Sequence, residues 1–196
     1  MIHENWAYVA VALNLVGTVL YIRDVLRGSA RPNRISWFVL SLAPLLAFSA
    51  MVAEGVMWKQ ALFTFIVGFC PFLIFLSSFV AKHPAWKLEK RDLVCAVLSV
   101  IGLILWKLSG EGAVAIIFGI LADGLAFLPT LIKAYTNPET ESYPLFLLGI
   151  VANMFNFAIL TSYDFAHLAF PVYILIADAL AFIFIYFKIG TKLKTL

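Results

Sequence analysis

Two carboxylates, Asp123 and Asp178, stand near the middle of long apolar stretches of the sequence. An aspartate at the centre of a membrane-spanning helix costs roughly 2.5–3.5 kcal/mol on insertion scales, so such a residue usually faces a cavity or a partner. No Lys or Arg lies near the middle of these stretches to act as that partner. We therefore expect at least one of the two carboxyls to carry a proton in one conformation and to exchange it, or a cation, in another. The alternative is a neutral aspartic acid that only hydrogen-bonds a neighbouring helix.

Three asparagines, Asn14, Asn153 and Asn156, add uncharged polar groups to similar apolar stretches. Each falls at helical spacing from small or polar residues and so belongs to a polar helix face. Such a face either packs helices closely or lines a cavity. We expect a cavity, with five candidate substrate contacts: Asn14, Asp123, Asn153, Asn156 and Asp178.

Four prolines, Pro44, Pro71, Pro129 and Pro171, also lie inside apolar stretches. A proline within a helix removes a backbone hydrogen bond and allows a kink. We expect these positions to act as hinges, with static kinks as the alternative.

The composition indicates that membrane helices position these residues. Of the 196 residues, 63% are hydrophobic and 13% are charged, and the mean hydropathy is +0.99. A chain this short cannot hide so much apolar surface in a water-soluble core. Soluble enzymes, nucleic-acid binders and secreted disulfide scaffolds are thereby excluded, and Cys70 and Cys95 are interpreted as small hydrophobes. No positively charged segment precedes the first apolar stretch, so we expect that stretch to be retained.

Seven apolar stretches are long enough, or nearly so, to cross a bilayer as helices. They cover residues 6–24, 36–53, 60–81, 93–108, 113–134, 144–162 and 168–188. The breaks between them are short, so we expect an all-α membrane protein with a single transmembrane domain over residues 1–196. An open β-structure would leave backbone groups unpaired in lipid.

The basic residues predict the orientation of these helices. All but Lys59 and Lys107 of the 14 Lys and Arg residues fall at or after the ends of the first, third, fifth and seventh stretches. Loops rich in Lys and Arg remain in the cytoplasm. The sequence therefore predicts an external N-terminus and a cytoplasmic C-terminus.

A short motif occurs twice, 106 residues apart. Residues 31–37 and 137–143 both place a proline four positions before a serine, and an aromatic residue follows the serine. Proline stops the preceding helix and serine is a good cap for the next one. The copies open the second and sixth stretches, which predicts an internal repeat of three helices.

Two parallel three-helix units then cover residues 1–81 and 112–190, and a linker helix covers residues 92–108. Parallel repeats of this kind are found in transporters. Asn14 and Asp123 become pseudo-equivalent, because each lies six residues before matching positions, Leu20 and Pro129.

This plan of three, one and three helices with an external N-terminus resembles the SWEET and PQ-loop transporter superfamily. The Pro-Gln dipeptide of that superfamily corresponds to Pro129-Thr130 in the second unit and to Leu20-Tyr21 in the first. The resemblance implies two parallel repeats and transport of a small solute by alternating access. The KDEL receptor and the nicotinamide-riboside transporters share a related plan, so the resemblance also admits a ligand receptor.

The sequence lacks the residues that several other functions would require. The seventh stretch has no Lys for a retinal Schiff base, and His3, His83 and His167 lie at or outside the ends of the stretches. The sequence has no metal-ligand spacing, no Gly-rich phosphate loop and no Cys-x-x-Cys. We therefore expect no enzyme activity, no cofactor and no metal.

We expect a secondary transporter or facilitator that moves a small polar solute by alternating access, with proton coupling as an option. The solute would be neutral or cationic and would resemble a sugar, an amino acid or a vitamin. Its partners would be the lipid bilayer and the solute, not nucleic acid, and a homo-oligomer is compatible with the sequence. The compact chain favours a multi-pass protein of a prokaryotic cytoplasmic membrane. A membrane ligand receptor and a structural membrane subunit on the same scaffold are the alternatives.

Overall fold

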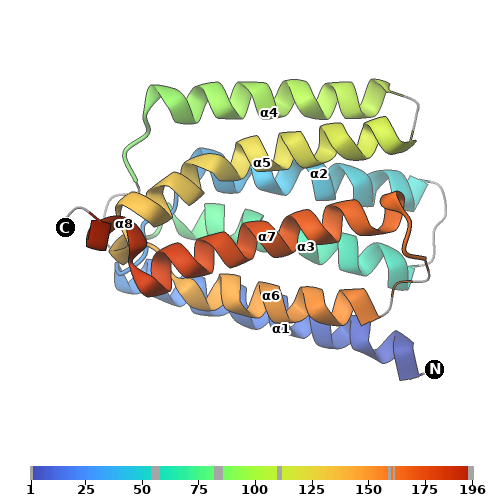
Figure 1. Cartoon of the computed structure of the whole chain (residues 1–196), viewed down its shortest axis with the longest axis horizontal. Coiled ribbons are helices and arrows are strands. Elements are labelled where there is room, and N and C mark those ends of the chain that lie inside the picture. Colours follow the sequence, from blue (N-terminus) through green and yellow to red (C-terminus); the bar gives the residue numbers. More distant parts are fainter. Residues whose placement is uncertain are drawn as a thin grey trace.

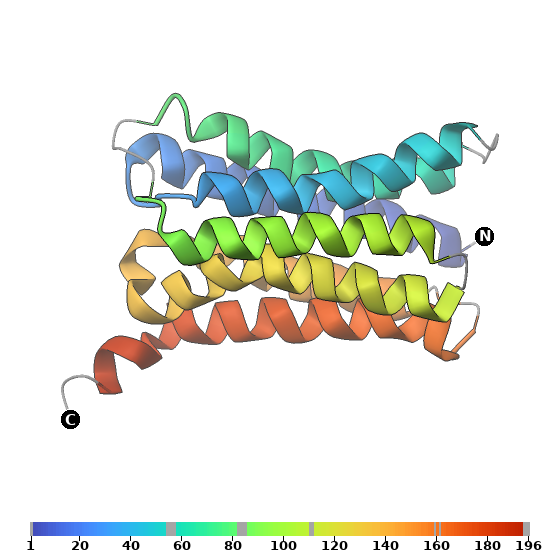
Figure 2. The same cartoon turned by 90° about the horizontal axis from the view of Figure 1, so that it is seen from above.

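The computed structural model describes residues 2–53, 58–81, 86–109, 112–158, 160 and 162–193, which form helices and no strands. The long helices lie side by side and alternate in direction (Figure 1, Figure 2). They are α1 (Ile2–Arg27), α2 (Arg34–Ala53), α3 (Trp58–Ser77), α4 (Lys90–Leu108), α5 (Gly112–Thr136), α6 (Tyr143–Ala158) and α7 (Phe165–Phe187). A 3-10 turn, η1 (Pro138–Thr140), precedes α6, and a short helix, α8 (Ile189–Leu193), follows α7. The predicted all-α fold is confirmed for the described residues.

Each apolar stretch predicted from the sequence falls mainly within one long helix. The clearest difference is at α3, which ends at Ser77 and not at residue 81. The Arg34 guanidinium donates to the Ser78 carbonyl oxygen at 2.8 Å and to the Ser78 hydroxyl at 3.0 Å. The Arg34 side chain thus supplies a hydrogen-bond donor to the Ser78 carbonyl oxygen, which a further helical turn would otherwise pair with a backbone N–H. The predicted end of the sixth stretch, at residue 162, is also wrong, because α6 ends at Ala158 and residues 160 and 162 are not helical. Residues 159 and 161 lie outside the described residues.

Three of the described helices are long and apolar enough to cross a membrane. The segments are Trp6–Arg27 in α1, Ile116–Thr136 in α5 and His167–Phe187 in α7. Shorter apolar segments lie in α2 (Arg34–Ser49), α3 (Thr64–Ser77) and α6 (Tyr143–Ala158). These lengths and compositions are compatible with a membrane protein.

The helices pack in the same order within each half of the chain. α3 contacts both α1 and α2, and α7 contacts both α5 and α6. The halves meet where α1 packs against α6 and where α2 packs against α5. α4 lies at the edge of the bundle against α5 and α2 (Figure 1). Six helices therefore surround the middle of the bundle, and α4 stands outside them.

Glycines allow two of these helix pairs to approach closely. A Cβ atom added at Gly17 in α1 would lie 3.2 Å from the Cα atom of Leu145 in α6. A Cβ atom added at Gly68 in α3 would lie 2.9 Å from the backbone nitrogen of Leu45 in α2. Small residues at such contacts are typical of helix packing in membranes.

Candidate functional site

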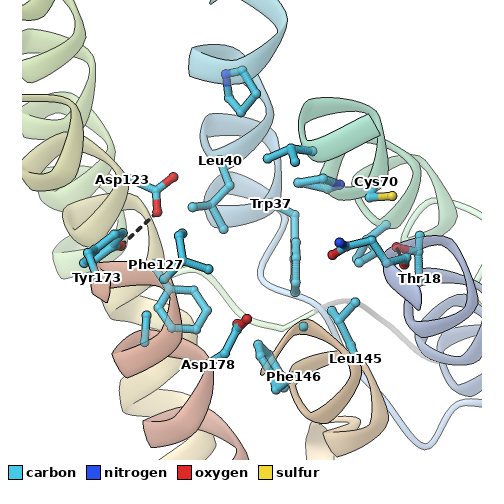
Figure 3. Close-up of a pocket in the computed structure, with 18 of the residues that line it drawn as sticks. Thr18, Trp37, Leu40, Cys70, Asp123, Phe127, Leu145, Phe146, Tyr173 and Asp178 are labelled. Carbon is cyan, nitrogen blue, oxygen red and sulfur yellow. Dashed lines mark hydrogen bonds between the residues drawn. The ribbon is translucent and has the colours of Figure 1, made fainter. Parts of the chain in front are cut away.

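A cavity of about 150 Å³ lies between the two halves of the bundle (Figure 3). Residues of α1, α2 and α3 line it from one half, and residues of α5, α6 and α7 line it from the other. Among the described residues that line it, none belongs to α4. A cavity of this volume holds a molecule about the size of benzene.

Both carboxylates singled out from the sequence face this cavity. Figure 3 shows Asp123 and Asp178 on one side of it and Thr18 on the other. The Tyr173 hydroxyl donates to Asp123 Oδ2 at 2.8 Å, which fixes the orientation of that carboxylate. The described lining residues include no Lys, Arg or His to pair with either carboxylate.

The Asp178 carboxylate occupies space that a glycine leaves open. It accepts no hydrogen bond from the described residues, and a Cβ atom added at Gly149 in α6 would collide with its Oδ2 atom. Gly149 therefore gives the carboxylate its position between α6 and the cavity. A buried carboxylate without a protein partner has to be neutralised by a proton or by a cation.

The α1 wall of the cavity supplies uncharged polar groups. Asn14 and Thr18 line the cavity, and Cys70 of α3 lies on the same side (Figure 3). The Asn14 amide nitrogen donates one hydrogen bond to the Ala10 carbonyl oxygen at 3.0 Å, which leaves the amide oxygen and the second N–H for a ligand. The Thr18 hydroxyl donates to the Asn14 carbonyl oxygen at 2.8 Å within the same helix.

Aromatic rings form much of the remaining surface. They come from four helices: Trp37 in α2, Phe127 in α5, Phe146 in α6, and Phe170 and Tyr173 in α7. Aliphatic side chains and two prolines complete the lining. The cavity thus combines a small number of polar groups with a largely apolar wall, as small-molecule sites commonly do.

The other two asparagines do not line the cavity. The Asn153 amide nitrogen donates to the Pro171 carbonyl oxygen at 2.7 Å and so joins α6 to α7. The Asn153 side chain is buried at this contact, and Asn156 is only partly buried. The structure therefore brings together Asn14, Asp123 and Asp178, while Asn153 acts in helix packing.

All four prolines lie inside helices. Pro44 and Pro71 line the cavity from α2 and α3, whereas Pro129 and Pro171 are not among its described lining residues. A role for any of them as a hinge stays a prediction.

A buried ion-pair cluster, formed by Tyr21, Lys133 and Glu141, joins the two halves at one end of the bundle. Lys133 Nζ lies 2.8 Å from Glu141 Oε1, and neither side chain is exposed to solvent. The Tyr21 hydroxyl donates to Glu141 Oε2 at 2.5 Å, and Lys133 Nζ also donates to the Arg31 carbonyl oxygen. The Trp86 ring lies 5.1 Å from Lys133 Nζ.

The two copies of the proline–serine motif meet beside this cluster. The Arg31 backbone N–H donates to the Thr140 carbonyl oxygen at 2.9 Å, and the Ser142 hydroxyl donates to Asp24 Oδ2 at 2.6 Å. The motif thus forms hydrogen bonds between the two halves, in addition to marking where helices end and begin.

Tyr21 connects the ion-pair cluster to the cavity. Its ring packs edge-on against Trp37 with 5.2 Å between the ring centroids, and Trp37 lines the cavity. Sequence reasoning missed this connection, because it placed Lys133 with the other basic residues of a cytoplasmic loop. A signal was present in Glu141, an acidic residue within the second copy of the motif.

Comparison of the chain with family models, with curated proteins and with solved structures finds no match.

Proposed function

We propose that this protein is a secondary transporter or facilitator that carries a small neutral or cationic solute through the cavity. One observation carries the proposal: two carboxylates without a basic partner face a cavity that is lined by six helices of two similar halves. A membrane protein that only held other subunits together would have no use for such groups, because each is costly to bury.

The proposed membrane topology has seven crossing helices, with the N-terminus outside. Most of the described basic residues gather where α1, α3, α5 and α7 end. The exceptions are Lys59, at the start of α3, and Lys107, near the end of α4, which lie at the other end of the bundle. The excess of Lys and Arg marks the cytoplasmic side. Lys82 and Lys194 lie outside the described residues.

The proposed internal repeat is supported by the order of helix packing. Exchanging α1, α2 and α3 for α5, α6 and α7 reproduces each contact within a half and both contacts between the halves. The pseudo-equivalent residues Asn14 and Asp123 also line the same cavity from different halves. A substrate site at the interface of two repeats is a common plan in secondary transporters, and it resembles that of the SWEET and PQ-loop superfamily.

Alternating access requires that the end holding the ion-pair cluster opens. In the proposed mechanism, the contact of Glu141 with Lys133 and Tyr21 keeps this end closed. Loss of that contact releases Tyr21 from Trp37 and so opens the cavity toward the cytoplasm. The solute then leaves, and any proton bound at Asp123 or Asp178 can exchange with it.

The test begins with a thermal-shift screen of the purified protein against sugars, amino acids, polyamines, nucleosides and vitamins. A compound that stabilises the protein is loaded into proteoliposomes, and counterflow of its labelled form is measured. We expect exchange by the wild type and by Asp164→Asn, and at least tenfold slower exchange by Asp123→Asn and Asp178→Asn. A stabilising compound that is not exchanged by the wild type would contradict transport.

Proton coupling is tested by the same assay at several external pH values. We expect the rate of the wild type to change with pH and the rate of Asp123→Asn to change less. The same dependence in both proteins would remove Asp123 from the coupling step.

A further inference from the structure

The composition of the cavity wall restricts the solute more than the proposed function does. Asp123 and Asp178 are the charged groups among its described lining residues, and both are acidic. An anionic solute would therefore find no positive charge on the described wall, and a carboxylate that has lost its proton would repel it. The wall favours positive charge.

A hydroxyl-rich solute fits the cavity poorly. Each hydroxyl group that is buried without a hydrogen bond costs free energy, on the order of 1–3 kcal/mol by mutational data. The polar side chains on the wall are few, and the rest of the surface is formed by rings such as Phe127, Phe146 and Phe170 together with aliphatic groups. A sugar would leave several hydroxyls against apolar surface.

A bare divalent metal ion is also disfavoured. Hard divalent cations take about six to eight oxygen ligands. The described residues contain no group of three or more His, Cys, Asp or Glu side chains that could hold a metal ion. Two carboxylates, one of them already bonded to Tyr173, do not complete such a shell.

An organic ammonium ion satisfies all of these features together. Its N–H groups would bond to Asp123 and Asp178, and aromatic faces such as Trp37 and Tyr173 attract a cation directly. Its apolar part would lie against Phe127 and Phe146. The volume of about 150 Å³ accommodates an apolar part of roughly the size of a benzene ring.

We propose that the cavity selects a small organic cation, with one ammonium group and a compact apolar body, over neutral and anionic solutes of the same size. This inference rests on the proposed role of the cavity as the solute site. It narrows the solute from neutral or cationic to cationic.

The test uses three probes of similar size: benzylamine, which is a cation at neutral pH, benzyl alcohol, which is neutral, and benzoate, which is an anion. Their binding is followed by the melting temperature of the purified protein. Cys70 supplies a second readout, because its thiol lines the cavity, whereas Cys95 lies on α4. In a Cys95→Ala background, a bound probe should slow maleimide labelling of Cys70.

We expect half-saturation by benzylamine at a concentration at least tenfold lower than by benzyl alcohol, and no effect of benzoate. Asp123→Asn and Asp178→Asn should each weaken the response to benzylamine about tenfold or more. The matched control is Asp164→Asn, which removes an exposed carboxylate outside the cavity and should leave the response unchanged.

Equal responses to benzylamine and benzyl alcohol would overturn the inference, as would a benzylamine response that survives in both Asn variants. Absence of any response, in melting temperature and in Cys70 labelling, would overturn it as well. Failure of the proposed function looks different. In that case benzylamine would bind selectively but would not show counterflow in proteoliposomes. Transport of a neutral solute in preference to its amine would instead support the proposed function and overturn the inference.

Discussion

At the scale of single residues, the two cavity carboxylates are held in different ways. Asp123 accepts a hydrogen bond from Tyr173, so its orientation is fixed by a neighbouring helix. Asp178 accepts none from the described residues and depends on the space beside Gly149. Ligand binding should therefore be sensitive to changes at Gly149, although this glycine carries no chemical group of its own.

Gly149→Ala should weaken solute binding about tenfold, or by roughly 1.4 kcal/mol, with little loss of fold stability. The added Cβ atom collides with the end of the Asp178 side chain, which can turn away, and alanine favours a helix more than glycine does. The control is Gly119→Ala in α5, where the nearest atom to the added Cβ, in Trp106, lies 3.9 Å away. Thermal-shift titration of both variants checks this. Equal weakening in the two would contradict the role given to Gly149.

Asp164, which precedes α7, should make the stability of that helix depend on pH. The His167 ring nitrogen lies 2.7 Å from Asp164 Oδ1, and this hydrogen bond, followed by those from the Ser162 hydroxyl and the His167 backbone, lowers the pKa of Asp164 to about 2. The ordinary value is about 3.9, so the stabilisation is complete above that pH and is lost as the pH falls through about 2.

We therefore expect Asp164→Ala to melt at a lower temperature than the wild type at neutral pH, with the difference narrowing as the pH falls toward about 2. The melting temperature of Asp164→Asn should fall less than that of Asp164→Ala, because an asparagine oxygen can still cap the helix. Melting curves at a series of pH values measure this. A difference that does not change with pH would contradict it.

At the scale of helices and loops, the ion-pair cluster decides how the halves are joined at one end. A charge that loses its partner while it stays buried costs about 3–5 kcal/mol, whereas removal of both charges can be nearly neutral. The Lys133–Glu141 pair is fully buried, so this contrast applies to it directly.

Lys133→Met should destabilise the fold by about 3–5 kcal/mol, and addition of Glu141→Gln should recover at least half of that loss. The control is Arg23→Met, because Arg23 pairs with Asp24 at an exposed site, where an ion pair contributes about 0–1 kcal/mol. Denaturant unfolding of the detergent-solubilised variants gives the comparison. Equal losses in the single and double variants would show that the pair is not a coupled unit.

At the scale of the whole molecule, the proposed topology predicts which end of the bundle faces the cytoplasm. Arg27 and Lys107 lie at opposite ends of the bundle, and both are exposed. In a background with Cys70 and Cys95 replaced by Ala, we expect a membrane-impermeant maleimide to label Lys107→Cys in intact cells. It should label Arg27→Cys only after lysis. The reverse pattern would invert the proposed topology.

The sequence by itself determined the helical class of the protein and the approximate helix ranges. Long apolar stretches broken by charged and turn-forming residues can satisfy their backbone groups only as helices in an apolar surrounding. It also identified Asp123 and Asp178 as residues that need a cavity or a partner, because the cost of an intramembrane carboxylate does not depend on the details of packing.

Only the tertiary structure decided which polar residues share that cavity. Asn14 and Asn153 have similar sequence surroundings, yet the first lines the cavity and the second bonds the Pro171 carbonyl. Helical periodicity gives the face of a residue, but not the element that lies opposite it. Lys133 shows the same limit. Its partners, the Glu141 carboxylate and the Arg31 carbonyl oxygen, are supplied by other segments of the chain, which only the packed bundle brings together.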